Sequence, residues 1–493
     1  MRWASAGRSR PGDPGKMARM ARTQEADLCI VGAGSAGLSV AAGAAQMGAR
    51  TVLIEAGKMG GDCLNTGCVP SKSLLAAGHA AEVIRTAGRF GIDGHEPEVD
   101  FARVHDHVQG VIAAIAPIDS QERFEGLGVT VIRAQASFCG PDVIEAGDVR
   151  VRARRFVLAT GSRPMVPPIP GLAETPYLTN ETIFDERAAP THLIVIGGGP
   201  IGCELAQAYR RLGAAVTVLD LGPILPKDDP ELAAVVRARL EAEGIALRER
   251  VQVRQVAPTA DGVAVTIEAN GRSEGIEGSD LLLAAGRAPQ VEGLNLEVAG
   301  VAYDRGGIKV DRRLRTTNKR IYAIGDVTGG PQFTHVGSYH AGIVIRNALF
   351  RLPARTDYRA LPWVTYTDPE LAQVGMTEAQ AKEAGQAAQV LHWTFEENDR
   401  AQTERRTEGL IKVVLGRRGH VLGASIVGLH AGELILPWGL AISQRLKVGA
   451  LANAIVPYPT LGEVSKRAAG AYYTPKLFSA RTRWLVRLLA RLG

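Results

Sequence analysis

Two glycine-rich turns constrain the fold of this chain more than any other feature. The pattern G-x-G-x-x-G occurs at 32–37 and again at 197–202, each time between an apolar, β-rich run and a helical stretch. The next apolar run ends in an acid about 20 residues further on, at Glu55 and at Asp220. Such turns let a pyrophosphate approach the amides of a helix N-terminus, while the acid binds ribose hydroxyls. We therefore predict two dinucleotide-binding βαβ units, with the alternative that one copy is only a packing turn.

The rest of the chain adds to this α/β pattern. The segment 79–118 is predicted to be helical and 129–160 to form short strands, with order beginning at Ala26. Similar strand-to-glycine turns at Gly161 and Gly286 mark the places where the chain leaves a nucleotide domain. A buried strand ends in Gly325-Asp326, where the carboxylate can bind a polyol. From Pro362 a separate α+β domain is predicted, with strands at 363–367, 389–395, 409–415 and 420–428 and helices at 431–446 and 463–472.

Composition excludes several other classes of protein. The 493 residues are 46% apolar, yet contain no apolar run of about 18 residues, which argues against a membrane-spanning protein. The formal charge of +6 comes from basic ends that together carry +11, so the body is near −5, which argues against nucleic-acid binding. Residues 1–24 lack the apolar core of a secretory signal. We expect a disordered basic extension, which translation from a start codon upstream of Met17 or Met20 would explain, with an organelle transit peptide as the alternative.

Five cysteines are too few for a disulfide scaffold, which indicates a reducing compartment and a cytoplasmic protein. Two of them, Cys63 and Cys68, lie in G-G-D-C-L-N-T-G-C-V-P-S-K at 60–72, beside the first nucleotide unit. A close pair is first a redox or metal-binding candidate. Zinc would need two more ligands, and no second pair or histidine cluster lies nearby, so we expect no metal site. The remaining cysteines are expected in the core: Cys29, Cys139 and Cys203.

The cysteine motif, the two glycine turns, Gly325-Asp326 and V-T-Y-T-D-P-E-L-A-Q-V-G at 364–375 together resemble the class I flavoprotein disulfide reductases. That family includes dihydrolipoamide dehydrogenase, glutathione reductase and mercuric reductase. The resemblance covers residues 26–473 and implies an FAD-dependent, NAD(P)H-consuming homodimer with two Rossmann-like nucleotide-binding domains and a C-terminal α+β dimerisation domain. The implied regions are 1–24 (extension), 25–165 with 287–360 (FAD), 166–286 (NAD(P)), 361–475 (dimerisation) and 476–493 (basic amphipathic tail).

The resemblance also implies roles for individual residues. Cys68 corresponds to the thiolate beside the flavin and Cys63 to the thiol that meets substrate, while Lys72 and Glu204 correspond to an ion pair near flavin N5; alternatively, Lys72 is a solvated helix residue. The FAD-binding candidates are Gly32, Gly34, Gly37, Glu55, Gly61, Lys72, Gly161 and Asp326. The nicotinamide-cofactor candidates are Gly197, Gly199, Gly202, Asp220 and Gly286. We expect NADH rather than NADPH, because Asp220 repels a 2′-phosphate and Lys227 is the only cation near it in the sequence.

The sequence departs from the family in V-P-Y-P-T-L-G-E at 456–463, where Tyr458 replaces the acid–base histidine and Glu463 is retained. A phenol with a pKa of about 10 is a poor substitute for an imidazole of about 6.5, so lipoamide and glutathione turnover are disfavoured. The tyrosine is similar to that of mercuric reductase, yet no cysteine follows Cys203 to deliver a soft metal. The acceptor is therefore left open among disulfides, quinones and metal ions, with dihydrolipoamide dehydrogenase, mercuric reductase and a flavin-binding redox sensor as alternatives.

The last 18 residues predict an amphipathic helix. At about 100° per residue, one face holds Trp484, Leu485, Leu488, Leu489 and Leu492, and another holds Arg483, Arg487 and Arg491. We predict peripheral contact with an anionic membrane, such as the inner membrane. The alternative is that this helix packs on the protein's own dimerisation domain.

Overall fold

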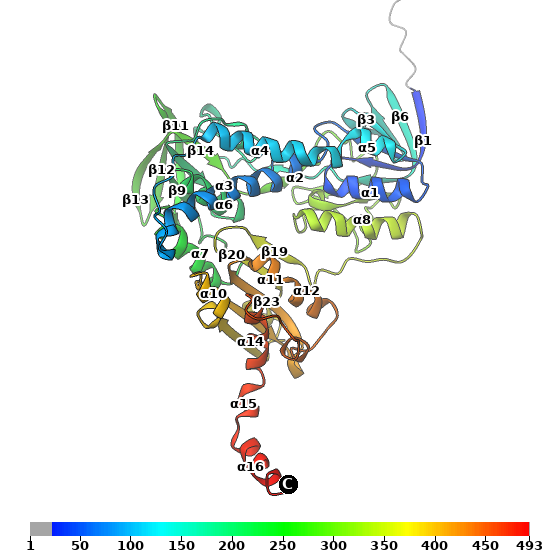
Figure 1. The fold of residues 1–493 in the computed structure, drawn as a ribbon. Helices are drawn as coiled ribbons and strands as arrows, with labels where there is room; N and C mark the ends of the chain where they lie inside the picture. The colour runs from blue at the N-terminus through cyan, green and yellow to red at the C-terminus, as the bar shows by residue number, and fades with distance from the viewer. Residues whose placement is uncertain (1–21, 493) are drawn as a thin grey trace, which may run out of the picture.

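The computed structural model describes residues 22–492, which form two α/β domains, a C-terminal α+β domain and a protruding tail (Figure 1). This is the predicted fold class. Residues 1–21, most of the predicted basic extension, lie outside the described residues. Strand β1 begins at Arg22, four residues before the predicted start, because its first residues pair with β6 from Val149 onward.

The first domain contains a sheet in the order β3-β2-β1-β6, in which neighbouring strands are parallel. Strand β18 adds to β6 in parallel and the β4–β5 hairpin adds in antiparallel. Helices α1 (Ser35–Gln46) and α8 (Thr334–Ala348) lie side by side on this sheet (Figure 1). The strands are β1 (Arg22–Val31), β2 (Thr51–Glu55), β3 (Val129–Arg133), β4 (Ala136–Gly140), β5 (Val143–Ala146), β6 (Val149–Leu158) and β18 (Ile321–Ala323).

The long helical segment predicted at 79–118 is two helices. Helix α3 (Cys68–Thr86) ends in a short 3-10 turn, and α4 (Phe101–Ile115) begins after a loop, with Asp100 capping its first turn. Gly91 and Gly94 lie in that loop, and Gly91 has a φ of +77°, which breaks the helix. The other helices of this domain are α2 (Gly61–Asn65) and α5 (Gln121–Gly126).

The second domain repeats the design on a smaller scale. Its parallel sheet has the order β10-β9-β8-β14, and a separate antiparallel sheet, β11-β12-β13, was not predicted. The elements are β8 (His192–Ile196), α6 (Pro200–Arg211), β9 (Ala215–Asp220), α7 (Pro230–Ala242), β10 (Ala246–Glu249), β11 (Gln252–Thr259), β12 (Gly262–Ala269), β13 (Arg272–Gly278) and β14 (Asp280–Leu283). The two chain crossings between the domains pair with each other as β7 (Ser162–Pro164) and β15 (Arg287–Pro289). A small hairpin, β16 (Tyr303–Asp304) and β17 (Gly307–Ile308), follows.

The C-terminal domain is an antiparallel sheet in the order β19-β20-β23-β22-β21, covered by short helices. The predicted strands are all present, and β20 is an additional one; the helix predicted at 431–446 is broken near Ile435 into α11 and α12. The elements are β19 (Pro362–Thr365), β20 (Glu370–Gly375), α9 (Glu378–Glu383), β21 (Gln389–Thr394), α10 (Asp399–Thr403), β22 (Leu410–Leu415), β23 (Val421–Gly428), α11 (Ala431–Leu434), α12 (Leu436–Ser443), α13 (Gly449–Ala452) and α14 (Glu463–Ala471).

The tail continues from α14 as α15 (Thr474–Leu477) and α16 (Ala480–Leu489) and extends away from the C-terminal domain (Figure 1). Ser479 caps α16 by accepting the backbone N–H of Thr482. No residue of α16 is buried, and Trp484 is 63% exposed. Within one chain, therefore, the amphipathic helix does not pack on its own dimerisation domain.

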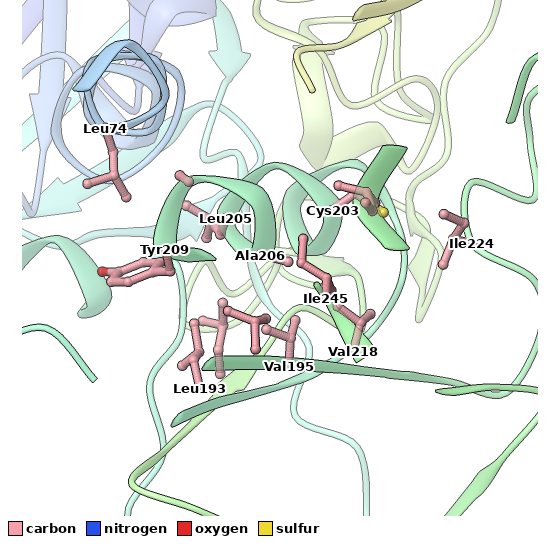
Figure 2. Packing of buried hydrophobic residues seen from close by; sticks show 14 of the residues in the cluster. Leu74, Leu193, Val195, Cys203, Leu205, Ala206, Tyr209, Val218, Ile224 and Ile245 are labelled. Carbon is pink, nitrogen blue, oxygen red and sulfur yellow. The ribbon is translucent and has the colours of Figure 1, made fainter. Parts of the chain in front are cut away.

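One hydrophobic core packs α3 of the first domain against α6 and β8 of the second domain. Figure 2 shows Leu74 of α3 facing Leu205 and Tyr209 of α6, which in turn cover Leu193 and Val195 of β8. The helices approach closely at Gly78, where an added Cβ would lie 3.3 Å from the Ala208 carbonyl oxygen. Helices α3 and α6 are thereby held in one fixed relation by apolar packing.

Candidate active site

The first glycine turn has the geometry expected of a nucleotide site. Gly32 has a φ of +102°, and a Cβ on Gly37 would lie 1.8 Å from the Gly32 carbonyl oxygen, so both positions require glycine. Gly34 precedes α1, and no side chain caps that helix. Glu55, at the end of β2, accepts the N–H groups of Ala33 (2.5 Å) and Gly57 (2.6 Å). The uncapped helix amides can donate to a pyrophosphate, and the fixed carboxylate can accept hydrogen bonds from ribose hydroxyls, so the residues fit FAD.

The second turn repeats these contacts. Gly197 has a φ of +117°, a Cβ on Gly202 would lie 1.9 Å from the Gly197 carbonyl oxygen, and Gly199 precedes α6, which no side chain caps. Asp220 accepts the N–H groups of Gly198 (2.6 Å) and Gly222 (2.7 Å). Both predicted units therefore place an acid against the second residue of their turn.

The structure adds to the second unit a cation that is distant in the sequence. Lys227 is not the only cation near Asp220, because β10 lies parallel to β9 and brings exposed Arg250 to the same edge. The backbone N–H of Arg250 donates to the Gly222 carbonyl at 3.2 Å. The sequence separation of 30 residues hides this neighbour.

The paired crossings form a polar junction beneath the first turn. Arg287 donates to the Ser162 hydroxyl (2.8 Å) and carbonyl (3.0 Å), and the Ser162 hydroxyl donates to Asp326 at 2.6 Å. Burial raises the pKa of Asp326, although the Ser162 hydrogen bond opposes this. Gly161 and Gly286 have φ values of +72° and +113° and turn the chain into and out of the second domain.

The same arginine holds the cysteine motif. Arg287 forms an ion pair with Asp62 at 2.5 Å and donates to Asn180, whose amide donates to the Thr66 carbonyl at 3.1 Å. Gly61, with a φ of +59°, packs on Gly34, where an added Cβ would lie 2.6 Å from the Gly34 Cα. The motif is thus fixed against the first glycine turn from two sides.

The two motif cysteines are free thiols in contact with each other. The hydrogen bond from Cys63 is the largest influence that lowers the pKa of Cys68, to about 6, and the Thr334 hydroxyl and Lys72 charge act in the same direction. That hydrogen bond, together with burial, raises the pKa of Cys63. The Cys68 sulfur lies 3.3 Å from the Thr334 hydroxyl. The two shifts have opposite directions, which favours the thiolate at Cys68 and the thiol at Cys63.

The resemblance makes Cys63 the thiol that meets substrate, so Cys63 should be the more exposed of the two. In the isolated chain, however, Cys68 is exposed and Cys63 is half-buried. Cys63 nevertheless lines a cavity of about 370 Å³, together with Ser35, Leu38, Ile115, Arg123 and Thr334. Among the other cysteines, Cys29 and Cys203 are buried as expected, whereas Cys139 is exposed, because it sits at an irregularity of the β4–β5 hairpin.

Lys72 and Glu204 form an ion pair at 2.7 Å across α3 and α6. The Glu204 side chain is buried, and the Lys72 ammonium also lies 4.4 Å from the ring centre of Tyr366. These contacts favour the paired role of Lys72 over a freely solvated one, with 37% of its side chain exposed.

Tyr458 and Glu463 belong to the C-terminal domain, where Glu463 begins α14, and Figure 1 shows α14 apart from α2, which carries Cys63. The Tyr458 hydroxyl donates to Asp399 at 2.9 Å, and this hydrogen bond is the main reason that the pKa of Tyr458 is raised. Asn398 donates to the Thr460 carbonyl at 3.1 Å and ties the two loops together.

Sequence reasoning missed Thr334, Arg287, Ser162, Tyr366 and Asp399, since each contact joins segments at least 59 residues apart. Two of these residues could have been predicted from the sequence. Arg287 directly follows Gly286 in its glycine turn, and Tyr366 lies within residues 364–375, which resemble the family.

Two family descriptions match this chain. Pyridine nucleotide-disulphide oxidoreductase matches residues 26–341, and its dimerisation domain matches residues 361–469. The chain belongs to this family. It is an FAD-dependent oxidoreductase that uses a pyridine nucleotide, which confirms the predicted family, enzyme class and fold class.

Two kinds of enzyme occur among the curated relatives, mercuric reductases and dihydrolipoyl dehydrogenases. Mercuric reductase of Streptomyces lividans is 37% identical over 454 residues, covering 90% of this chain and 96% of the relative. Dihydrolipoyl dehydrogenase of Thermus scotoductus is 38% identical over 454 residues, covering 91% and 97%.

Solved structures agree with this assignment. LpdA from Mycobacterium tuberculosis superposes with a TM-score of 0.83 at 29% identity, covering 92% of this chain and 99% of that one. The Cu(II) complex of the HOCl-induced flavoprotein disulfide reductase RclA from Escherichia coli has a TM-score of 0.79 at 29% identity, covering 89% and 98%.

The described residues also limit other assignments. Over residues 22–492 no group of three or more histidine, cysteine or acidic side chains is arranged to hold a metal ion. Within the same residues, no helix combines the length and apolar character needed to cross a bilayer.

Proposed function

We propose that this member of the family passes electrons from NADH to a Cys63–Cys68 disulfide and then to a small thiol-reactive acceptor. The observation that carries the proposal is the unequal pair: Cys68 has a pKa of about 6, whereas that of Cys63 is raised. In the reductive half-reaction, NADH and the disulfide give NAD⁺, one thiolate and one thiol. The Cys68 sulfur keeps the negative charge and Cys63 takes the proton.

FAD, when bound, relays the electron pair between nicotinamide and disulfide. The first turn, Glu55, Asp326 and the Gly61 backbone would hold it, and Glu204 would keep the Lys72 ammonium in place, whose charge acts on Cys68. In the oxidative half-reaction, the Cys63 proton first passes to a base such as the Cys68 thiolate, and the resulting Cys63 thiolate attacks the acceptor. With a disulfide acceptor, one thiol leaves as a mixed disulfide forms on Cys63. Cys68 then attacks Cys63, and with one further proton the second thiol leaves as the Cys63–Cys68 disulfide re-forms. This division of labour rests on position, because Cys63 lines the cavity whereas the Lys72 charge acts on Cys68.

The nicotinamide cofactor is proposed to be NADH. The Asp220 carboxylate is held by two backbone amides and keeps free lone pairs for ribose hydroxyls, whereas a 2′-phosphate would meet its charge. Arg250 lessens this repulsion, so we expect the enzyme to prefer NADH without excluding NADPH.

The active unit is proposed to be a homodimer in which Tyr458 and Glu463 complete the partner's site. Tyr458 commits its proton to Asp399, which leaves the phenol oxygen as an acceptor or ligand and not as an acid. Rapid proton shuttling, which lipoamide and glutathione reduction need, is thereby disfavoured. A thiophilic metal ion or an acceptor that needs little proton transfer fits this site better.

Acceptor screening tests this part of the proposal. Purified enzyme with NADH is offered lipoamide, glutathione disulfide, a quinone, Cu(II) and Hg(II), and the variant C63S is the matched control. We expect turnover of a metal ion or quinone above that of lipoamide, with the metal activity lost in C63S. Fast lipoamide turnover would instead make the protein a dihydrolipoyl dehydrogenase.

We also propose that the tail binds an anionic membrane surface. Residues 476–492 carry five cations and no acid, and the apolar face of α16 is uncovered within the chain. On that apolar face, Trp484, Leu489 and Leu492 are 63%, 52% and 77% exposed. An apolar face beside an arginine face is the pattern of helices that lie in the headgroup region, where each cation contributes about 1 kcal/mol.

Co-sedimentation with liposomes tests this surface. The full chain is expected to bind vesicles that contain phosphatidylglycerol and not pure phosphatidylcholine vesicles, and binding should fall with salt. A chain that ends at Pro475, and the variant L488D, should stay in the supernatant. Equal binding by all three proteins, or binding by none, would contradict the proposal.

A further inference from the structure

We propose that Tyr366 is a positioning residue that holds the Lys72 ammonium at the active site. This inference rests on the proposed function, because it concerns the cation beside the reactive thiolate. It assigns a role inside the site to the dimerisation domain of the same chain.

Three contacts support this role. The Lys72 Nζ lies 4.4 Å from the ring centre of Tyr366, within the range of a cation–π interaction. Glu204 bridges the same two residues, since Oε2 pairs with Lys72 at 2.7 Å and Oε1 accepts the backbone N–H of Tyr366 at 2.9 Å. The ammonium is therefore held by a carboxylate and a ring face that are themselves joined.

Each of these residues comes from a different domain. Lys72 is on α3, Glu204 is on α6, and Tyr366 follows β19 in the C-terminal domain. The position of the ammonium consequently depends on how the segment after β19 docks on α6.

That docking is well determined. Glu204, Gln207 and Arg211 recur at helical spacing on α6, and all three are buried. Gln207 accepts the Asp368 N–H at 2.7 Å and donates to its carbonyl at 2.9 Å, while Arg211 pairs with the Asp368 carboxylate at 3.0 Å. A single polar stripe on α6 thus fixes the segment that carries Tyr366.

The consequence for the thiolate is electrostatic. Lys72 lies four residues after Cys68 on α3, and the Cys68 sulfur contacts the Thr334 hydroxyl at 3.3 Å. The Cys63 thiol, the Thr334 hydroxyl and the Lys72 charge lower the pKa of Cys68, whereas the Asp62 charge raises it. If the ring is removed, Lys72 can turn toward solvent, and the charge that favours the thiolate is then more distant.

The variants Y366L and Y366F form a matched pair, since phenylalanine keeps the ring face. The readout is the pH midpoint of the long-wavelength thiolate–flavin absorbance of NADH-reduced holoenzyme. We expect Y366L to raise this midpoint, with a two- to tenfold smaller thiolate-to-thiol ratio at pH 6, about the size of a cation–π contact. Y366F should keep the wild-type midpoint.

A double-mutant cycle separates positioning from a general effect on the fold. In the K72M background there is no ammonium to position, so adding Y366L should leave the midpoint unchanged. An equal shift in both backgrounds, or no shift of Y366L in wild-type enzyme, would overturn the inference. Failure of NADH to produce the absorbance in wild-type enzyme would instead contradict the proposed function. Should Y366L fail to fold, Y366M provides the same comparison.

Discussion

The Cys68 sulfur lies 3.3 Å from the hydroxyl of Thr334, the first residue of α8. This contact joins two segments that are 266 residues apart, and it brings a hydrogen-bond donor to the proposed thiolate. Because a hydrogen bond to the charged form favours that form, Thr334 contributes to the low pKa of Cys68.

Replacing Thr334 by valine should raise the pH midpoint of Cys68 ionisation. The shape is nearly kept while the donor is lost, and a hydrogen bond worth roughly 0.5–1.5 kcal/mol corresponds to a midpoint higher by about 0.4–1.1. The thiolate would then be lost at a higher pH as the solution is acidified. Titration of the thiolate–flavin absorbance measures this, with T334S as the control that keeps the hydroxyl; an unchanged midpoint in T334V would remove Thr334 from the site.

The two cysteines should differ when they are replaced singly. C63S is expected to keep NADH-driven flavin reduction and the thiolate–flavin absorbance, yet to lose turnover of disulfide acceptors. C68S should lose that absorbance, because the remaining sulfur has the raised pKa. Anaerobic spectra of both variants check this, and the reverse pattern would exchange the two assigned roles.

Tyr458 and Asp399 should affect only the oxidative half-reaction, in which the acceptor is reduced. We expect Y458F and D399A each to slow the oxidative half-reaction by about tenfold, the effect of losing one hydrogen bond of roughly 1.4 kcal/mol, and to leave the reductive half-reaction unchanged. Stopped-flow measurement of the two half-reactions separates these effects. If both variants match wild type with every acceptor, the Tyr458–Asp399 contact serves packing only.

Asp220 and Arg250 should have opposite effects on cofactor choice. D220A is expected to lower kcat/KM for NADH by about tenfold, because the ribose contacts are lost. The difference in kcat/KM between NADH and NADPH should therefore become smaller. R250A should lower kcat/KM for NADPH and leave that for NADH near wild type. A wild-type enzyme that prefers NADPH would contradict the assignment.

Local patterns predicted those parts of the fold that depend on neighbouring residues. Each glycine turn with its acid lies within about 25 residues, so the turns around Gly34 and Gly199 were recognisable from spacing alone. The β11-β12-β13 sheet and the break at Ile435 were missed, because short antiparallel strands and helix ends are decided by tertiary packing.

The same limit applies to the site. The motif around Cys63 is contiguous and was found, whereas Thr334, Arg287 and Tyr366 reach it through the sheet order and the docking of α6. A sequence shows that a cation such as Lys72 is present, but its contact with Tyr366 exists only after three domains have packed together.

Anaerobic titration of the purified holoenzyme with NADH tests the central claim most directly. One equivalent of NADH per FAD should open the Cys63–Cys68 disulfide and produce long-wavelength absorbance from the Cys68 thiolate beside oxidised flavin. That absorbance should disappear below about pH 6, as the thiolate is protonated. Bleaching of the flavin by the first equivalent, with no long-wavelength absorbance at any pH, would contradict the proposed electron path.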